Sequence, residues 1–435
     1  MGEAAELIAH GRRQLAAGQA MEAAAALASA TEIEPVSADV FCDLAIAHHR
    51  AGDPARAVAA CREALARAPD HAAANLNLAC ILRELDRLGE AVAHADRAER
   101  IALVTGDDAL LADARFNRGL AKLGLGQVDA GWQDWDGRLA QPLWTRFDPA
   151  RRWTGEPLHG RSLVVRREQG IGDELFFATC YPELLRRAGD GPVVIEADAR
   201  FAPALSRALP GATLHAIDTV AGRAAAMAGR PAPAGAARAP QGDLWVAAGS
   251  LPGLVGLPDT AQPLLAPLPE LRRRWIDRLA ALPGAGPMVG LCWRSSQASA
   301  RRDRFQAGIE QMAPLLRLDN IRCVSLQIGL AERERTLAGA PLHHFDDVDL
   351  ANDLEQALAL VSALDLVVSV GTWIVPLAGT VGTPAWYLSA LRDFWTLGQD
   401  TIPWFRAMRV LPTAEGDFTA SATEAAQAIA MGGWR

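Results

Sequence analysis

Two carboxylates stand in one glycine-containing segment, Glu168-Gln169-Gly170-Ile171-Gly172-Asp173. A carboxylate at the rim of a cleft can take a proton from a substrate hydroxyl, so Asp173 is a candidate general base and Glu168 a second one. Glycines at 170 and 172 allow a tight turn and the close approach of another molecule. The competing interpretation is structural. Asp173 would then be the N-cap of a helix predicted over 174–185, where a lowered pKa would weaken it as a base.

A second candidate segment ends an apolar run with an arginine and a hydroxyl, Gly290-Leu291-Cys292-Trp293-Arg294-Ser295. An arginine there can hold a phosphate or a carboxylate by forked hydrogen bonds, which makes Arg294 and Ser295 candidate ligand-binding residues. Arg304 is a further candidate on the cleft side, whereas Arg301 and Arg302 fit a solvated basic loop. Gln327 ends the next apolar run and could read a nucleobase or a ribose.

A third candidate site is the start of a small-residue helix after the apolar run 364–370. A helix start offers unpaired N–H groups and a positive dipole end, so the segment Gly371-Thr372-Trp373 is a candidate seat for a phosphate. Open α/β sheets bind ligands at this edge. A buried crossover without any ligand is the alternative. Asp353, with Gln356 three residues later, is typical of a helix-capping pair.

Composition narrows the functional classes. A chain of 435 residues is too long for one ordinary core, so two or three domains are expected. The net charge of −8 argues against a partner in duplex nucleic acid. Six scattered cysteines without a CxxC pair predict reduced thiols, and no metal site is expected. The first residues lack a signal-peptide pattern and no apolar window is long enough for a membrane span, so a cytoplasmic location is predicted.

Internal repetition organises the first third of the chain. Ala57-Val58 returns at Ala91-Val92, a spacing of 34 residues. Small residues keep this period at two further positions, as do two prolines: Gly11, Ala45 and Ala79; Ala30, Ala64 and Ala98; Pro35 and Pro69. The pattern resembles the tetratricopeptide repeat, in which paired helices touch at small residues. A fourth, irregular unit has Gly119 and Gly131 at these places. Stacked units form a groove for peptides or partner proteins.

After residue 161 the pattern changes to short apolar runs that alternate with helices. The first sheet is expected to contain 163–166, 193–197 and 244–247, and the second 288–293, 322–327, 366–369 and 385–388. Residues 221–241 are low in complexity and predict a surface loop or frayed helix. The Pro-Gly segment 283–287 is the predicted linker. The predicted domains are therefore a helical-repeat domain over 1–140 and two doubly wound domains over 141–285 and 286–435.

The motifs form an ordered set that covers nearly the whole chain: 153–160, 168–173, 250–252, 290–294, 325–327 and 364–386. As a set they resemble the tetratricopeptide-containing glycosyltransferases of bacteria, whose catalytic half is similar to lipopolysaccharide heptosyltransferases and more distantly to O-linked N-acetylglucosamine transferases. The resemblance implies an α plus α/β fold, with tetratricopeptide repeats followed by a GT-B fold of two Rossmann-like domains. It places the acceptor on the first Rossmann-like domain and the nucleotide-sugar donor on the second. The family's Gly-x-Gly-Asp aspartate falls on Asp173.

Two positions depart from the family pattern. Where the family has Val-Asp-Thr and then His-Leu-Ala-Gly, this chain has Gly371 at the aspartate and Pro376 at the histidine. Either the donor differs or catalysis has been lost. The neighbouring residues resemble the branch linked to flagellin glycosylation, whose members use CMP-activated nonulosonic acids such as pseudaminic or legionaminic acid. One phosphate fits a reduced phosphate site, and an acidic sugar would give Arg294 or Arg304 a carboxylate partner.

The resemblance implies a metal-independent transferase that needs no cofactor beyond its nucleotide-sugar co-substrate. It would act on serine or threonine hydroxyls of a protein held by the repeat groove, with flagellin as the candidate acceptor. Asp173 would take the hydroxyl proton, while the 371–373 helix start and the Arg294-Ser295 loop stabilise the leaving phosphate. Two alternatives stay open: a non-catalytic adaptor or chaperone with a degenerate transferase fold, and a transferase for lipid-linked or polysaccharide acceptors.

Overall fold

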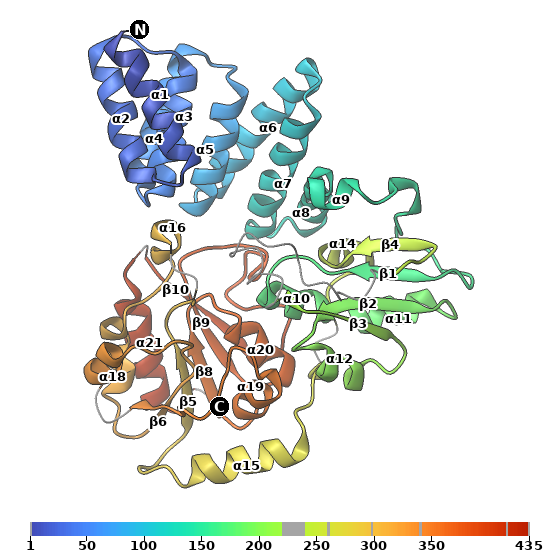
Figure 1. The fold of residues 1–435 in the computed structure, drawn as a ribbon. Helices are drawn as coiled ribbons and strands as arrows, with labels where there is room; N and C mark the ends of the chain where they lie inside the picture. The colour runs from blue at the N-terminus through green and yellow to red at the C-terminus, as the bar shows by residue number, and fades with distance from the viewer. Residues whose placement is uncertain are drawn as a thin grey trace. The chain divides into compact units, whose positions relative to one another are not determined.

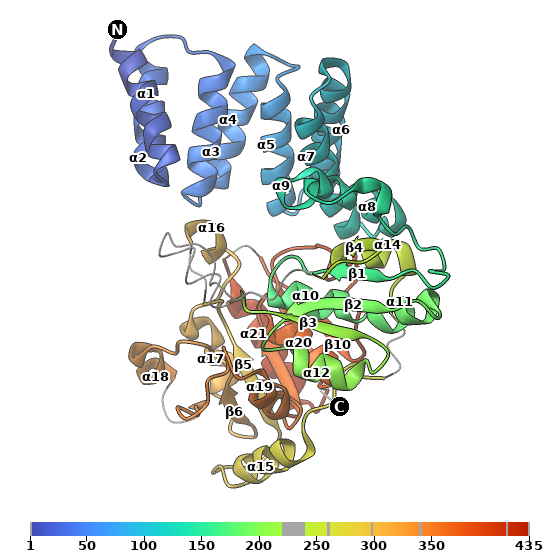
Figure 2. The same cartoon turned by 45° about the vertical axis from the view of Figure 1, so that its right-hand side comes forward.

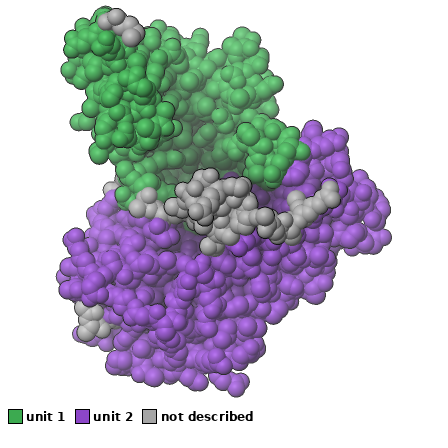
Figure 3. Space-filling view, viewed as in Figure 1, with its two compact units in different colours: residues 1–146, 297–305, 390–398 green, residues 147–296, 306–389, 399–435 purple. Residues whose placement is uncertain are grey.

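The structure, a computed structural model, describes residues 2–219, 240–258, 262–296, 299–338, 342–414 and 416–433. The chain divides into two compact units, coloured in Figure 3. Unit 1 comprises 1–146, 297–305 and 390–398, and unit 2 comprises 147–296, 306–389 and 399–435. Nearly all of the low-complexity segment 221–241 lies outside the described residues. The domain limits at 140 and 285 stay predictions, but two short segments from the last predicted domain cluster with the repeats.

Unit 1 is built from helix pairs that stack in chain order (Figures 1 and 2). The pairs are α1 (Glu3–Ala16) with α2 (Ala20–Ile33), α3 (Ala38–Arg50) with α4 (Pro54–Arg67), α5 (Ala72–Glu84) with α6 (Leu88–Thr105), and α7 (Asp108–Gly124) with α8 (Val128–Trp135). Two short helices, α9 (Pro142–Thr145) and α16 (Ala300–Asp303), complete the unit. The four pairs confirm the predicted repetition, including the irregular fourth unit.

The periodic small residues lie where the helices touch. Ala45 and Ala64 are fully buried, and a Cβ added at Gly11 would lie 2.6 Å from the Leu27 side chain. In the fourth pair the approach is closer still, because a Cβ at Gly119 would lie 2.6 Å from the Trp135 nitrogen and 2.8 Å from the Gly131 carbonyl oxygen. The sequence period therefore reports close packing between helix backbones.

Gly119→Ala is expected to lower the free energy of unfolding of unit 1 by about 1–3 kcal/mol, because the added methyl group meets backbone atoms that cannot rotate aside. Thermal and denaturant melts of the full chain would measure the loss. Gly89→Ala is the matched control: Gly89 is also helical, no atom lies within 4 Å of its added Cβ, and the change should be neutral or stabilising. Equal melts for both variants would contradict the close contact.

The first sheet of unit 2 is parallel, with the order β3-β2-β1-β4. Its elements are β1 (Leu163–Arg166), α10 (Ile171–Ala178), α11 (Tyr181–Ala188), β2 (Val193–Asp198), α12 (Ala202–Ala208), β3 (Thr213–Ile217), β4 (Leu244–Ala247) and α14 (Leu251–Val255). The three predicted strands are confirmed, and β3 was not predicted. The single helix predicted over 174–185 is wrong. The chain breaks into two helices before Pro182, which lacks the N–H that a continuing helix requires.

The second sheet is also parallel, with the order β10-β9-β8-β5-β6-β7. Its strands are β5 (Met288–Cys292), β6 (Arg322–Ser325), β7 (Leu342–His343), β8 (Leu366–Ser369), β9 (Ala385–Ser389) and β10 (Met408–Pro412). Its helices are α15 (Pro269–Ala280), α17 (Ala313–Leu316), α18 (Glu332–Ala338), α19 (Leu354–Val361), α20 (Ile374–Val381) and α21 (Phe418–Ala430). The four predicted strands are confirmed, whereas β7 and β10 were not predicted.

The two Rossmann-like halves meet within unit 2 through α10 and α20, which follow a central strand of each sheet. The ring of Phe176 on α10 lies 5.5 Å from that of Trp404 and 5.2 Å from that of Phe405. Gly379 on α20 has to lack a side chain, because a Cβ there would lie 2.3 Å from the Phe405 ring. This packing sets the helix starts, and hence the loops before them, in a fixed relation. Among the described helices, none has the length and apolar character needed to cross a membrane.

Candidate functional site

The glycine loop leads into the first turn of α10. Gly170, not Asp173, is the N-cap, and Asp173 is the third helical residue. The half-buried Asp173 carboxylate reaches back and accepts the Gly170 N–H at 3.3 Å. The interpretation of Asp173 as the N-cap is therefore wrong, because the N-cap is Gly170, three residues earlier. Asp173 instead accepts the N–H of that N-cap from the first turn of the helix.

Glu168 supports this loop from behind. Its side chain is buried, and its carboxylate accepts the Gly249 N–H at 2.5 Å. A Cβ at Gly249 would lie 2.6 Å from the same oxygen, so only glycine fits there. The exposed Gln169 has a φ of +61°, a left-handed conformation that few non-glycine residues adopt. We therefore interpret Glu168 as a residue that fixes the loop rather than as a second base.

A buried ionic network lies beneath α10, and no motif in the sequence predicted it. Glu174 pairs with Arg167 at 2.5 Å and accepts the backbone N–H of Asp198 at 2.8 Å. Burial raises the pKa of Glu174, although Arg167 opposes the change. Arg200 binds the Asp198 carboxylate at 2.8 Å and donates to the carbonyl oxygen of Ala351 in the second half at 2.6 Å. The network thus ties α10, the helix that carries Asp173, to the sheet and to the other half.

In the loop after β5, Arg294 already has a partner. Its Nε and one terminal nitrogen donate to both carboxylate oxygens of Glu334, at 2.8 and 2.6 Å. Burial alone would raise the pKa of Glu334, but hydrogen bonds from Arg294 and Trp293 lower it to about 2. The pair is therefore ionised at neutral pH. The structure gives Arg294 a protein carboxylate in place of the predicted phosphate or sugar acid, so direct ligand binding by its fork would require this pair to open.

Gln327 holds the same loop from below. It is 1% exposed, and its amide oxygen accepts the backbone N–H groups of Trp293 and Arg294 at 3.2 and 3.1 Å. Its amide nitrogen donates to the Arg294 carbonyl oxygen at 2.9 Å and to that of Ile328 at 3.0 Å. With its polar atoms occupied in this way, Gln327 positions the loop, and its predicted contact with a base or ribose finds no support in the geometry. The Ser295 N–H donates to the Gln306 side chain at 3.1 Å.

The predicted helix start is present, and α20 begins at Ile374 with Trp373 as its N-cap. The Thr372 hydroxyl is buried and lies 3.0 Å from the Ser369 hydroxyl, so it fixes the turn and is not presented to solvent. The exposed Gly371 and the half-buried Trp373 make no backbone N–H hydrogen bond to another described residue. Two unpaired N–H groups at a helix start form a seat for an anion.

The glycine loop before α10 and the turn before α20 touch each other. A Cβ at Gly172 would lie 3.4 Å from the Cα of Trp373 and 3.9 Å from Pro376. Gly371 and Pro376, the two departures from the family pattern, therefore lie on either side of Trp373, the residue that contacts the glycine loop. A cavity of about 30 Å³ lies beside them, with Arg294, Ser295 and Thr372 among its lining residues. That volume is about enough for one water molecule, so this cavity does not by itself hold a nucleotide.

Arg304 and Arg301 belong to unit 1, unlike the residues above. The Arg304 guanidinium lies 5.3 Å from the centre of the Phe305 ring, and its role as a cleft residue stays a prediction. Arg301 forms an ion pair with the buried Glu84 of α5. The Arg301 side chain is 47% exposed, in keeping with a solvated basic segment, but it also pairs with a carboxylate more than 200 residues earlier, which the sequence did not indicate.

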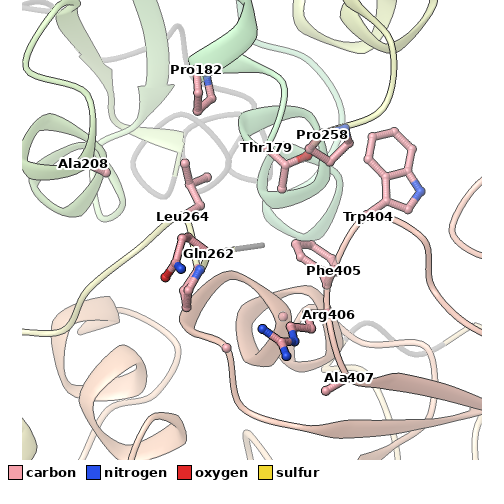
Figure 4. Close-up of a pocket in the computed structure, with 13 residues that line it drawn as sticks. Thr179, Pro182, Ala208, Pro258, Gln262, Leu264, Trp404, Phe405, Arg406 and Ala407 are labelled. Atoms are coloured by element: carbon pink, nitrogen blue, oxygen red, sulfur yellow. The ribbon is translucent and has the colours of Figure 1, made fainter. Parts of the chain in front are cut away.

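A larger cavity of about 590 Å³ lies at the opposite ends of α10 and α20 (Figure 4). Thr179 and Pro182 from the first half and Trp404, Phe405 and Arg406 from the second line it. Mostly apolar residues surround it. No motif in the sequence pointed to this cavity, because its lining comes from five separate segments.

Known proteins resemble both the helical repeats and the Rossmann-like halves of the chain. The tetratricopeptide repeat family matches residues 8–70 and 42–102. Protein FlbA of Caulobacter vibrioides (strain ATCC 19089 / CIP 103742 / CB 15) is 31% identical over 408 residues, which cover 91% of this chain and 67% of that protein. The match spans both the repeats and the Rossmann-like halves.

Solved structures resemble the chain at low identity. The ADP-heptose lipopolysaccharide heptosyltransferase II of Escherichia coli is 17% identical and covers 63% of this chain and 100% of its own, with a TM-score of 0.41. An O-GlcNAc transferase of Thermobaculum terrenum is 16% identical and covers 99% of this chain and 90% of its own, with a TM-score of 0.36.

Proposed function

The chain belongs to the family of protein FlbA, and from this premise we propose that it is a glycosyltransferase that moves a sugar from a nucleotide-sugar to serine or threonine hydroxyls of a protein. One observation carries the proposal: the loop with the Asp173 carboxylate touches the helix start with the unpaired N–H groups of Gly371 and Trp373. A proton acceptor and an anion seat thus lie on neighbouring helix starts of one unit. Group transfer from a phosphate to a hydroxyl needs both.

In this mechanism the acceptor oxygen attacks the anomeric carbon of the sugar as its hydroxyl proton passes to Asp173. The bond from that carbon to the phosphate oxygen breaks, and the nucleotide phosphate leaves with the electron pair. The N–H groups at the start of α20 stabilise its negative charge. A single displacement of this kind inverts the configuration at the anomeric carbon. No step requires a metal ion or a cofactor other than the donor.

We further propose that the donor is a CMP-nonulosonic acid. Gly371 and Pro376 leave the helix start without the aspartate and histidine of the family pattern, which suits a donor with one phosphate. The acceptor we propose is flagellin, bound by the repeat groove. We place the reaction in the cytoplasm, because all six cysteines are free and reducing conditions keep thiols in that state.

A non-catalytic adaptor is the second candidate. Two observations favour it: the cavity of about 30 Å³ beside Arg294 is too small for a donor, and Arg294 is already paired with Glu334. In that case the repeats would bind the acceptor protein and the Rossmann-like halves would transfer nothing.

Intact-mass measurement separates the two candidates. The full chain is incubated with flagellin and, in separate reactions, with CMP-nonulosonic acid, a UDP-sugar and an ADP-sugar. We expect flagellin to gain the mass of one or more nonulosonic acid residues with the CMP donor alone. Flagellin binding without a mass shift from any donor, together with no nucleotide binding by calorimetry, would establish the adaptor and refute the transferase.

A further inference from the structure

The turns within the helix pairs repeat one unusual backbone conformation. In each turn one residue has a left-handed φ. It is a glycine in the first, second and fourth pairs, Gly18 (+78°), Gly52 (+82°) and Gly126 (+75°), but it is Asp86 (+56°) between α5 and α6. Glycine adopts this conformation without strain, and aspartate is one of the few other residues that tolerate it. An aspartate at this position has a higher backbone energy than a glycine, and a favourable contact of its side chain can offset that cost.

Asp86 finds that contact in the segment 390–398. Its carboxylate accepts the backbone N–H of Arg392 at 3.2 Å and the Arg392 Nε at 2.9 Å. The next turn receives the same segment closely, since a Cβ at Gly124 would lie 2.5 Å from the Arg392 carbonyl oxygen. Two successive turns of the repeats thus bind one loop.

The segment 299–305 binds the neighbouring turns. A Cβ at Gly52 would lie 2.8 Å from the Ala300 carbonyl oxygen, so this turn and α16 are in direct contact. Glu84, whose side chain is 3% exposed, binds both His49 at 2.7 Å and Arg301. Burial by itself raises the pKa of Glu84, but these hydrogen bonds lower it to about 2, so Arg301 meets a full negative charge.

Apolar packing accompanies the ionic contacts. Phe394 is 9% exposed, and its ring lies 5.4 Å from that of Trp135 and 6.4 Å from that of Trp132 on α8. Leu397 of the same segment is buried. A loop with a buried aromatic anchor and a carboxylate-bound arginine is a built part of unit 1, whose segments Figure 3 shows in one colour.

These two segments are the continuations of the second sheet. The first follows β5 and the residues Arg294 and Ser295, and the second follows β9 directly. We propose that the turn edge of the repeats, formed by Gly52, Glu84, Asp86, Gly124 and Gly126, holds the loops that leave β5 and β9 and so orders the donor-side residues 293–296 through the chain. Glu84 and Asp86 are then positioning residues that act through Arg301 and Arg392. The repeats serve the donor site as well as a protein partner.

A matched pair of glycine variants tests the contact at Gly52. Gly52→Ala and Gly18→Ala impose the same left-handed strain at the same turn position, but no atom lies within 4 Å of a Cβ at Gly18. In the full chain we expect hydrogen exchange over 299–305 to rise about tenfold or more in Gly52→Ala. Gly18→Ala should leave that exchange unchanged. Equal exchange in the two variants would overturn the proposal.

A second pair tests Asp86. Asp86→Gly restores the residue found in the other turns and removes the Arg392 contact, and we expect exchange over 390–398 to rise about two- to fivefold. Asp70→Ala, which breaks the exposed pair of Asp70 with Arg97 elsewhere in the repeats, is the control and should not change it. In a double-mutant cycle, Asp86→Gly should have a smaller effect in Arg392→Ala than in the native chain, because Arg392→Ala already lacks the Nε contact and keeps only the backbone N–H that Asp86 accepts. Additive effects would mean that the two residues do not act together.

The consequence for the donor site rests on the proposed function and has its own readout. In Gly52→Ala with Asp86→Gly, we expect the KM for the donor to rise severalfold while kcat is retained, because the donor loop is less ordered but Asp173 is untouched. An unchanged KM with raised exchange would overturn the link to the donor site. If no donor is used at all, the proposed function fails, and the exchange experiments still decide whether the turn edge holds the loops.

Discussion

Asp173→Asn is expected to slow sugar transfer by about 10²–10⁴-fold, the contribution typical of a general base. Asparagine keeps an oxygen that can accept the Gly170 N–H, so the first turn of α10 stays closed. The free energy of unfolding should change by less than about 1 kcal/mol. The measurement is the single-turnover rate of acceptor mass shift, with thermal melts of both proteins in parallel.

Asp417→Asn is the control for this prediction. Asp417 is the N-cap of α21 in the same unit, and its side chain accepts the Thr419 N–H at 3.1 Å. Asp417→Asn also removes a carboxylate from a helix start, but this helix is not the one that follows the glycine loop. The sugar-transfer rate should therefore stay at the native value. A transfer rate of Asp173→Asn that equals that of Asp417→Asn would show that Asp173 is not the base.

Gly371→Asp is expected to weaken CMP binding by about tenfold or more, because a carboxylate at the start of α20 would compete with the phosphate for its N–H groups and repel it. Gly371 is exposed, and its φ lies outside the left-handed region, so a side chain is tolerated by the backbone. Isothermal titration with CMP would give the dissociation constants. The added Cβ would lie 3.2 Å from the Tyr387 hydroxyl, a tight approach that requires its own control.

Gly371→Asn supplies that control, since asparagine has the size of aspartate without its charge. We expect Gly371→Asn to bind CMP more weakly than the native chain by a smaller factor than Gly371→Asp. The ratio between the two variants isolates the charge. Equal dissociation constants for the two variants would place the phosphate elsewhere and remove the main support for the anion seat.

The strands that the sequence predicted best are the buried ones. β4 is a continuous apolar run, β1 and β8 are apolar except for their last residues, Arg166 and Ser369, and all residues of the three strands are buried, so composition alone indicates them. By contrast, β7 is two residues long and half-buried, and β10 contains the exposed Arg409. Such strands form because a neighbouring strand offers hydrogen bonds, and that neighbour is distant in the sequence.

The loops that carry the site were predictable from local rules, but their side-chain partners were not. Asp353 caps α19 through the Gln356 N–H at 3.1 Å, which confirms half of the predicted capping pair, whereas the Gln356 side chain accepts the Trp275 indole N–H instead of closing the pair. The partner of Arg294, however, is Glu334, 40 residues away on another element. Its pairing depends on how β6 and α18 are placed in space. Residue types at the sheet edge therefore predicted candidate ligand-binding positions, while tertiary contacts decide which of those side chains already have protein partners.

The chain order of unit 1 has a consequence for synthesis. Arg392, the partner of Asp86, is separated from it by 306 positions, and the ribosome incorporates Arg392 only after the residues between them. For Glu84 and Arg301 the separation is 217 residues. At roughly 5–20 residues per second, the interval before Arg392 is made is about 15–60 s. During that time the nascent repeats expose a turn edge on which Asp86 lacks Arg392 and Glu84 has His49 but lacks Arg301, and the site for Phe394 is open. The nascent chain thus exposes to chaperones and partners a turn edge that the segments 299–305 and 390–398 cover in the full-length fold.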